Sequence, residues 1–79
     1  METIVISKQT GKILRNIRVI ERKTLNEMGK AVKIAPTHLD QIELGHLIPR
    51  KETLQRVCDH YGLTMAQLTG QQPINWALF

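Results

Sequence analysis

The 79-residue sequence has a single cysteine, few aromatic residues and no long apolar run. One cysteine, Cys58, cannot form a disulfide within the chain, and this usage is compatible with a reducing compartment. No stretch approaches the roughly 18 consecutive apolar residues that indicate a transmembrane helix, and no basic segment followed by an apolar stretch suggests a signal peptide. We therefore expect a cytoplasmic protein without a membrane partner.

Motifs for catalysis and for cofactor binding are also absent from the sequence. It contains neither a P-loop nor a G-x-G-x-x-G motif, and its histidines and cysteine form no H-x3-H or C-x2-C pair for zinc. Cys58, Asp59 and His60 carry groups that nucleophilic catalysis uses, but consecutive residues on a helix point to different faces. The sequence thus predicts no enzyme activity, no metal site and no cofactor.

The length and charge of the chain favour one small domain with an anionic partner. A chain of 79 residues has room for one compact core, and a hydrophobic content of 42% is typical of a globular protein. Eleven Lys and Arg residues against seven Asp and Glu residues give a net charge of +4. On so small a surface, this charge favours a polyanion such as nucleic acid.

Apolar residues recur at intervals of three and four over residues 8–70, which predicts a helical core. Two capping boxes mark helix starts, Thr24 with Glu27 and Thr64 with Gln67. Pro36 marks a further start, because the first helical position does not need the N–H that proline lacks. Five helices are expected: from about residue 8 to 22, from 25 for about two turns, from 36 to a stop near Gly45, from Pro49 or Thr53 to Gly62, and from 65 to Gly70.

The two ends of the chain have a different pattern. Residues 1–7 alternate loosely and predict a short β-strand or an arm, and a strand needs a partner to be stable. Residues 71–79 offer one, within the chain or across a dimer, because they form an apolar C-terminal segment. Its apolar residues are Ile74, Trp76, Leu78 and Phe79. They either fold onto the chain's own core or form a dimer interface, which we favour because a small monomer has little reason to carry such residues beyond its last helix.

Residues 24–45 are typical of two short helices separated by a tight turn at residues 33–36, which is a helix-turn-helix. An amphipathic basic helix precedes them, Ile42-Glu43-Leu44-Gly45 forms an I-E-x-G signature, and Pro49 follows shortly after. On these motifs, residues 11–68 resemble the lambda-repressor/Cro-like, or XRE-type, family of helix-turn-helix domains. The resemblance implies an all-α, five-helix domain over residues 1–79 that binds double-stranded DNA with its third helix in the major groove.

The resemblance also implies roles for particular residues. The face of helix three opposite Leu39 and Ile42 is expected to reach base edges, where Gln41 suits adenine. The residues on this face are Pro36, Thr37, His38 and Gln41. Basic residues beside helix three are expected to contact the DNA backbone, namely Lys33, His46, Arg50 and Lys51. Glu43 matches a family glutamate that pairs with a basic residue of helix one, which is Arg18 here, so a structural ion pair is expected.

Three residues depart from the family pattern. Leu25 stands where the family usually has a glutamine that touches DNA, and Gly29 replaces a small alanine. Lys33 replaces the glycine of the turn, so Lys33 either adopts a positive φ or belongs to a turn of another kind.

Two functions are compatible with these features. The first is a homodimeric, sequence-specific transcriptional regulator, a repressor that reads an inverted repeat with half-sites about 34 Å apart. The second is a protein-interaction module with the same fold and weak or lost DNA binding, such as an antitoxin that binds a toxin. An exposed Leu25 would favour the second function, whereas steeply salt-dependent DNA binding would count against it.

Overall fold

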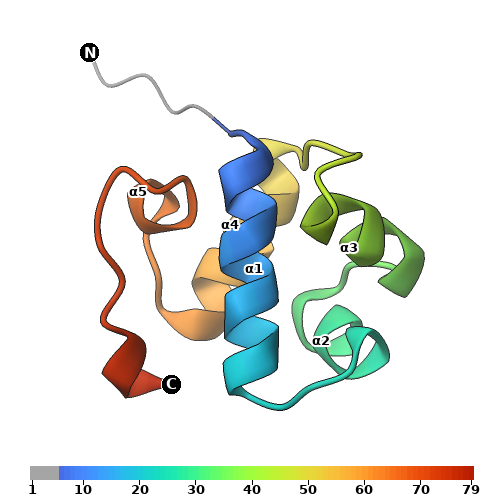
Figure 1. The fold of residues 1–79 in the computed structure, drawn as a ribbon, viewed down its shortest axis with the longest axis horizontal. Helices are drawn as coiled ribbons and strands as arrows, with labels where there is room; N and C mark the ends of the chain where they lie inside the picture. The colour runs from blue at the N-terminus through green and yellow to red at the C-terminus, as the bar shows by residue number, and fades with distance from the viewer. Residues whose placement is uncertain (1–5) are drawn as a thin grey trace.

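The computed structural model describes residues 6–79. They form α1 (Lys8–Ile20), α2 (Leu25–Val32), α3 (Pro36–Glu43), α4 (Lys51–Tyr61), α5 (Met65–Leu68) and a short 3-10 helix, η1 (Trp76–Leu78). α1 crosses the centre of the molecule, with α2 and α3 on one side, α5 and the C-terminal segment on the other, and α4 behind (Figure 1). Within residues 6–79, no helix is both long enough and apolar enough to cross a lipid bilayer. The prediction of an all-α fold with five helices is confirmed.

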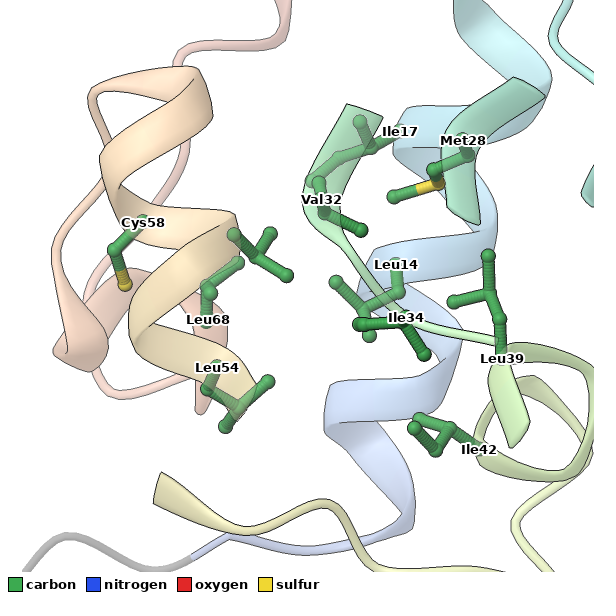
Figure 2. Close-up of a cluster of buried hydrophobic side chains, with 11 residues drawn as sticks. Leu14, Ile17, Met28, Val32, Ile34, Leu39, Ile42, Leu54, Cys58 and Leu68 are labelled. Carbon is green, nitrogen blue, oxygen red and sulfur yellow. The ribbon is translucent and has the colours of Figure 1, made fainter. Parts of the chain in front are cut away.

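The core is one cluster of buried apolar side chains from all five α-helices and the turn between α2 and α3 (Figure 2). Burying a Leu, Ile or Val side chain contributes about 1.5–3 kcal/mol relative to leaving it exposed, so this cluster holds the helices on one another. α1 contacts both α3 and α5, which makes it the central support for α3. The cluster consists of Leu14, Ile17, Met28, Val32, Ile34, Leu39, Ile42, Leu54, Val57, Cys58 and Leu68.

Both capping boxes occur as predicted. At the start of α2, the Thr24 hydroxyl accepts a hydrogen bond from the Glu27 N–H at 3.1 Å, and the Glu27 carboxylate accepts one from the Thr24 N–H at 2.9 Å. Thr64 and Gln67 repeat the pattern at the start of α5, at 3.2 and 2.9 Å. Because four N–H groups at each helix start lack a partner within the helix, these bonds fix where α2 and α5 begin.

Two predicted helix boundaries are shifted in the structure. α1 ends at Ile20, two residues before the expected residue 22, because Arg22 adopts a left-handed backbone conformation with φ of 55°. α4 begins at Lys51, between the two entry points considered, and its preceding residue Arg50 makes no side-chain cap. At the other end of α4, Gly62 has φ of 67° and ends the helix as predicted.

The C-terminal segment is not the strand partner that the sequence analysis offered for residues 1–7. Residues 76–78 form η1, in which the Asn75 side chain accepts a hydrogen bond from the Ala77 N–H at 3.2 Å. The helical turn places Trp76 and Phe79 on one side, with ring centroids 5.7 Å apart, and both pack against the core. The aromatic residues of this segment pack on the chain's own core and do not lie along a strand. Most of the proposed partner strand, residues 1–5, lies outside the described part of the chain.

The C-terminal segment packs on the chain's own core, whereas the sequence analysis had favoured a dimer interface for it. Phe79 also contacts the Tyr61 ring of α4, at a centroid distance of 5.8 Å. Ile74 is half-buried, and the side chain of Leu78 is outside what the structure describes. Trp76 and Phe79 each keep part of their surface exposed, so the segment covers its own core without being fully buried.

Candidate nucleic-acid interface

The turn between α2 and α3 depends on one lysine and one glycine. Lys33 ends α2 in the left-handed conformation, with φ of 60° and ψ of 44°, which settles the alternatives left by the sequence. The next N–H, of Ile34, donates to the carbonyl of Gly29 at 2.9 Å, and the Ile34 side chain enters the core. A Cβ on Gly29 would lie 2.5 Å from the Ile34 carbonyl oxygen. Gly29 therefore allows the chain to turn back tightly against α2 and sets the direction of α3.

α3 is also fixed against α1, at two points. Gly11 of α1 lies so close to the backbone carbonyl of Ile42 that any side chain on it would overlap this carbonyl. About two turns further along α1, the Arg18 guanidinium binds the carboxylate of Glu43, the last residue of α3. The structure thus brings together the two residues that the sequence analysis paired.

The Arg18–Glu43 contact is bidentate and largely buried. Arg18 Nε lies 2.9 Å from Glu43 Oε2, and Arg18 Nη2 lies 2.9 Å from Oε1. Nη1 donates to the carbonyl of Lys23 at 3.2 Å, so the guanidinium also holds the connection between α1 and α2. The Glu43 side chain is only 4% exposed. Hydrogen bonding to Glu43 raises the pKa of Arg18 further, so the pair stays ionised and acts as a structural clamp.

Of the four residues predicted to read bases, Thr37 and Gln41 lie on the outer side of α3, and Pro36 and His38 lie at its two edges, toward α2 and α4 respectively. Leu39 and Ile42 are buried on the opposite side. Among the four, Thr37, His38 and Gln41 are exposed, and Pro36 is half-buried at the start of the helix. The positions share a helix that is anchored at its turn, at Gly11 and at Arg18, so their side chains are presented from a rigid support.

Pro36 and Thr37 open onto a groove between the starts of α2 and α3. Residues of α2 and its cap line the other side of this groove, namely Thr24, Leu25 and Asn26, and Asp40 lines it from α3. Leu25, which was suspected of being a surface for a protein partner, is only half-exposed and packs against the core. Its apolar side chain therefore has a structural role in the fold, which weakens the case for lost DNA binding.

The chain after α3 returns toward Gln41. Gly45 has φ of 79°, which a glycine adopts without strain, and the next residue is His46. The N–H of His46 donates to the Gln41 carbonyl at 2.9 Å, and the N–H of Leu47 donates to the same oxygen at 3.2 Å. The side chains also meet, because His46 Nδ1 lies 3.3 Å from Gln41 Oε1. His46, predicted as a DNA-backbone contact, is thus bound to a residue predicted to read a base.

A pocket of about 360 Å³ lies between the start of α3 and the first half of α4. We call it the α3–α4 pocket. Three cationic side chains line it, Lys33 from the turn, Arg50 from the loop and Arg56 from α4, together with His38. Leu47 and Ile48 supply apolar surface and are 40% and 48% exposed. Of the described residues that line this pocket, none is acidic, so it suits an anionic group.

Arg56 is a candidate that sequence reasoning missed. The basic residues were chosen for closeness to α3 along the chain, and Arg56 is thirteen positions beyond the end of α3 at Glu43. Helical spacing predicts that Arg56 lies on the exposed side of α4, between buried Leu54 and Val57. The spacing cannot predict that this side of α4 lies beside Lys33, because that depends on how α4 packs. Lys51 is exposed at the first position of α4 but does not line the pocket.

Cys58, Asp59 and His60 do not form a site. Cys58 is 4% exposed within the core, and burial raises the pKa of its thiol, which disfavours the reactive thiolate. Asp59 and His60 are exposed, and the Asp59 carboxylate accepts a hydrogen bond from Gln55 at 3.0 Å. Among residues 6–79, no group of three His, Cys, Asp or Glu side chains is placed to hold a metal ion.

Comparisons with known proteins agree with this geometry. A family model described as "Helix-turn-helix" matches residues 14–68. The fold is similar to the crystal structure of the clp gene regulator ClgR from C. glutamicum, with a TM-score of 0.69 and 25% sequence identity, over 90% of this chain and 92% of that one. Among curated proteins, no sequence matches the chain.

Proposed function

Because the chain belongs to the XRE-type helix-turn-helix family, we propose that it is a homodimeric transcriptional repressor that reads an inverted repeat with α3. The family and the structural neighbour support a DNA-binding regulator. The operator form, the dimer and repression are the proposed additions. The observation that supports the reading of DNA by α3 is the exposed polar face of this anchored helix with the cationic α3–α4 pocket beside it.

In this proposal α3 lies in the major groove and its exposed side chains face base edges. The Gln41 amide can accept from and donate to adenine, and Thr37 offers a hydroxyl and a methyl group suited to thymine. Pro36 and His38 flank them at the two edges of this face, toward α2 and α4. A good bidentate contact discriminates against a wrong base by about 1–3 kcal/mol, so two or three such residues give a useful but modest specificity per half-site.

Phosphates are bound on the side of the α3–α4 pocket. Lys33, Arg50 and Arg56 line this pocket, and Lys51 is exposed at the first position of α4, beside Arg50. Phosphate contacts set position and register without reading sequence, and each one neutralised adds about 0.9 to the slope of log affinity against log salt. Four such contacts from one protomer make binding strongly salt-dependent.

A dimer follows from the need for two half-sites, because a single helix-turn-helix module binds only one face of DNA. The C-terminal segment, residues 71–79, is the proposed contact, using the exposed parts of Ile74, Trp76 and Phe79. Sedimentation equilibrium tests this proposal, and the wild type should dimerise. Ile74→Asp should be monomeric because it places a charge in the proposed contact, and it should still fold because Ile74 does not belong to the core cluster. A monomeric wild type that still binds one half-site would contradict the dimer and leave DNA reading intact.

The experiment that tests the proposed function is a selection from random duplex DNA at about physiological salt, where non-specific binding is weak. Recovery of an inverted repeat with half-sites about one helical turn apart is the expected result. Recovery of no sequence by folded protein would contradict the proposal.

The second candidate function is a protein-interaction module, and one observation favours it. Val19 of α1 and Leu44 after α3 are 56% and 57% exposed, and both line a shallow pocket together with Lys12 and Arg15. An acidic partner with an apolar side, such as a toxin, would fit this surface. Failure of the DNA selection together with protein binding that Leu44→Asp abolishes would favour this candidate.

A further inference from the structure

We infer that His46 is a specificity-determining residue that orients the Gln41 side chain, so that Gln41 selects adenine over guanine. This inference rests on the proposed function of α3 as a DNA reader. It differs from the role of His46 expected from its sequence position, which was a contact to the DNA backbone. The observations that carry it are the side-chain contact between His46 and Gln41 and the backbone bonds that hold these residues together.

The backbone makes the contact a built feature of the turn after α3. The Gln41 carbonyl accepts from the N–H groups of both His46 and Leu47, at 2.9 and 3.2 Å. Gly45 supplies the positive φ that returns the chain, and a Cβ there would lie 3.3 Å from the Lys8 side chain of α1. The His46 ring therefore stands beside the Gln41 side chain independently of any ligand.

The contact as the structure has it belongs to one form of the His46 ring. Gln41 Oε1 is a carbonyl oxygen and only accepts, so Nδ1, which lies 3.3 Å from it, donates in the form of the ring that carries a hydrogen on Nδ1. If the Gln41 amide rotated by half a turn, its NH2 group would face the Nδ1–H, and two donors would oppose each other. The Nδ1–H form of His46 is part of the inference, and in this form the ring favours one orientation of the amide plane.

That orientation matches adenine and not guanine. Oε1 keeps a second lone pair, which can accept from the exocyclic N–H of adenine, while the amide NH2 donates to adenine N7. Guanine presents two acceptors at this edge, O6 and N7. A glutamine free to rotate could offer guanine its NH2 group, whereas a glutamine held by His46 places its oxygen against O6. His46 thus acts through Gln41 and needs no contact with DNA.

Three variants separate this role from a backbone contact. His46→Ala removes the ring, His46→Asn keeps an N–H donor near the position of Nδ1, and Arg50→Ala serves as a control in which a proposed phosphate contact is lost. We expect His46→Ala to reduce the preference for adenine over guanine at the Gln41 position by roughly 2- to 10-fold, the value of one hydrogen bond. The salt dependence should stay unchanged. His46→Asn should recover most of the preference, and Arg50→Ala should weaken binding to all sequences and lower the salt slope.

A measurement without DNA tests the contact itself. In the free protein, ¹⁵N relaxation of the Gln41 side-chain NH2 should report an ordered amide in the wild type and in His46→Asn, and a mobile amide in His46→Ala. Equal mobility in all three would overturn the inference whether or not DNA is bound. A loss in His46→Ala that is the same for every DNA sequence, with a salt slope smaller by about 0.9, would also overturn it in favour of a phosphate contact.

The failure of the inference and the failure of the proposed function are distinguishable. If the wild type selects no DNA sequence, the proposed function fails and the specificity role fails with it, while the relaxation data still report the contact. If the wild type selects an operator but His46→Ala keeps the same base preference, only the inference fails.

Discussion

Arg18 on α1 and Glu43 at the end of α3 form a bidentate ion pair, with both shortest N···O distances at 2.9 Å. The Glu43 carboxylate is almost completely buried, so removing the guanidinium leaves a charge without compensation. Since α3 carries the residues proposed to read DNA, this pair connects the stability of the core to the position of the reading helix.

Arg18→Ala should therefore lower the free energy of unfolding by about 3 kcal/mol, which is the lower end of the range for breaking a buried pair. Denaturant unfolding followed by circular dichroism measures it. As a control, Lys23→Ala removes one partner of a longer and more exposed contact to Glu21, at 3.4 Å, and should cost about 0–1 kcal/mol. Equal losses of unfolding free energy in the two variants would show that the burial of Glu43 does not increase the cost of breaking its ion pair.

Lys33→Gly should stabilise the fold by about 0.5–1 kcal/mol. Relief of the left-handed conformation gains about 1–2 kcal/mol, and part of this is offset because glycine has more freedom in the unfolded chain. Arg22→Gly is the matched control, because Arg22 has a similar φ of 55° and lies outside the α3–α4 pocket. Both variants should gain stability, but only Lys33→Gly should lower the salt slope of DNA binding. A stabilised Lys33→Gly with an unchanged slope would remove Lys33 from the phosphate contacts.

Gly29→Ala should destabilise the protein, although alanine favours a helix by about 1 kcal/mol over glycine. The added Cβ would lie 2.5 Å from the Ile34 carbonyl oxygen, which is backbone and cannot move without shifting the turn. We expect a net loss of about 1–3 kcal/mol in thermal or denaturant unfolding, typical of overpacking. A more stable Gly29→Ala would contradict this, because it would mean that the turn can move away from α2 without loss of stability.

Glu27 should titrate abnormally because of the capping box. Hydrogen bonds from the Thr24 N–H and hydroxyl lower the pKa of the Glu27 carboxyl in the folded state. A lowered folded-state pKa contributes stability above the unfolded pKa, and this contribution is lost as the pH falls through the folded value. Thr24→Ala removes the hydroxyl but keeps the N–H, so in an NMR titration it should return the Glu27 pKa only part of the way to its ordinary value. Loss of the cap should cost about 1 kcal/mol of stability. A titration unchanged by Thr24→Ala would contradict this assignment.

Arg56→Ala should weaken binding to all DNA sequences and lower the salt slope by about 0.9, without a change in base preference. Because Arg56 is exposed and its nearest side-chain bond, to Thr53, is long at 3.4 Å, stability should change little. Lys30→Ala removes the same charge from an exposed position of α2 that does not line the α3–α4 pocket. Equal effects of Arg56→Ala and Lys30→Ala on the slope would show that net charge, rather than the pocket, is responsible.

The sequence predicts the helices well because their signals are local. The Thr24 and Thr64 capping boxes, Pro36 at the start of α3 and Gly62 after α4 each act on the nearest few residues, and their positions agree with the structure. The C-terminal segment, residues 71–79, was offered as a partner for an N-terminal strand, but its conformation depends on contacts with the rest of the chain. Whether Trp76 and Phe79 face a strand or a core is a tertiary matter.

For the candidate site, the sequence predicts the positions on α3 but not the contacts made by other elements. The exposed face of α3 follows from helical spacing and from the family resemblance. Arg56 and the contact between His46 and Gln41 do not, because they depend on the packing of α4 and on the path of the loop after Gly45. Side chains that approach from another element leave no periodic signal in the sequence.

The central claim is that α3 reads bases through its exposed face, and Gln41 tests it most directly. The affinities of the wild type and of Gln41→Ala should be compared on the selected operator and on random duplex DNA at the same salt concentration. We expect a loss of about 1–3 kcal/mol on the operator and no loss on random DNA. An unchanged operator affinity, or an equal loss on both DNAs, would contradict it.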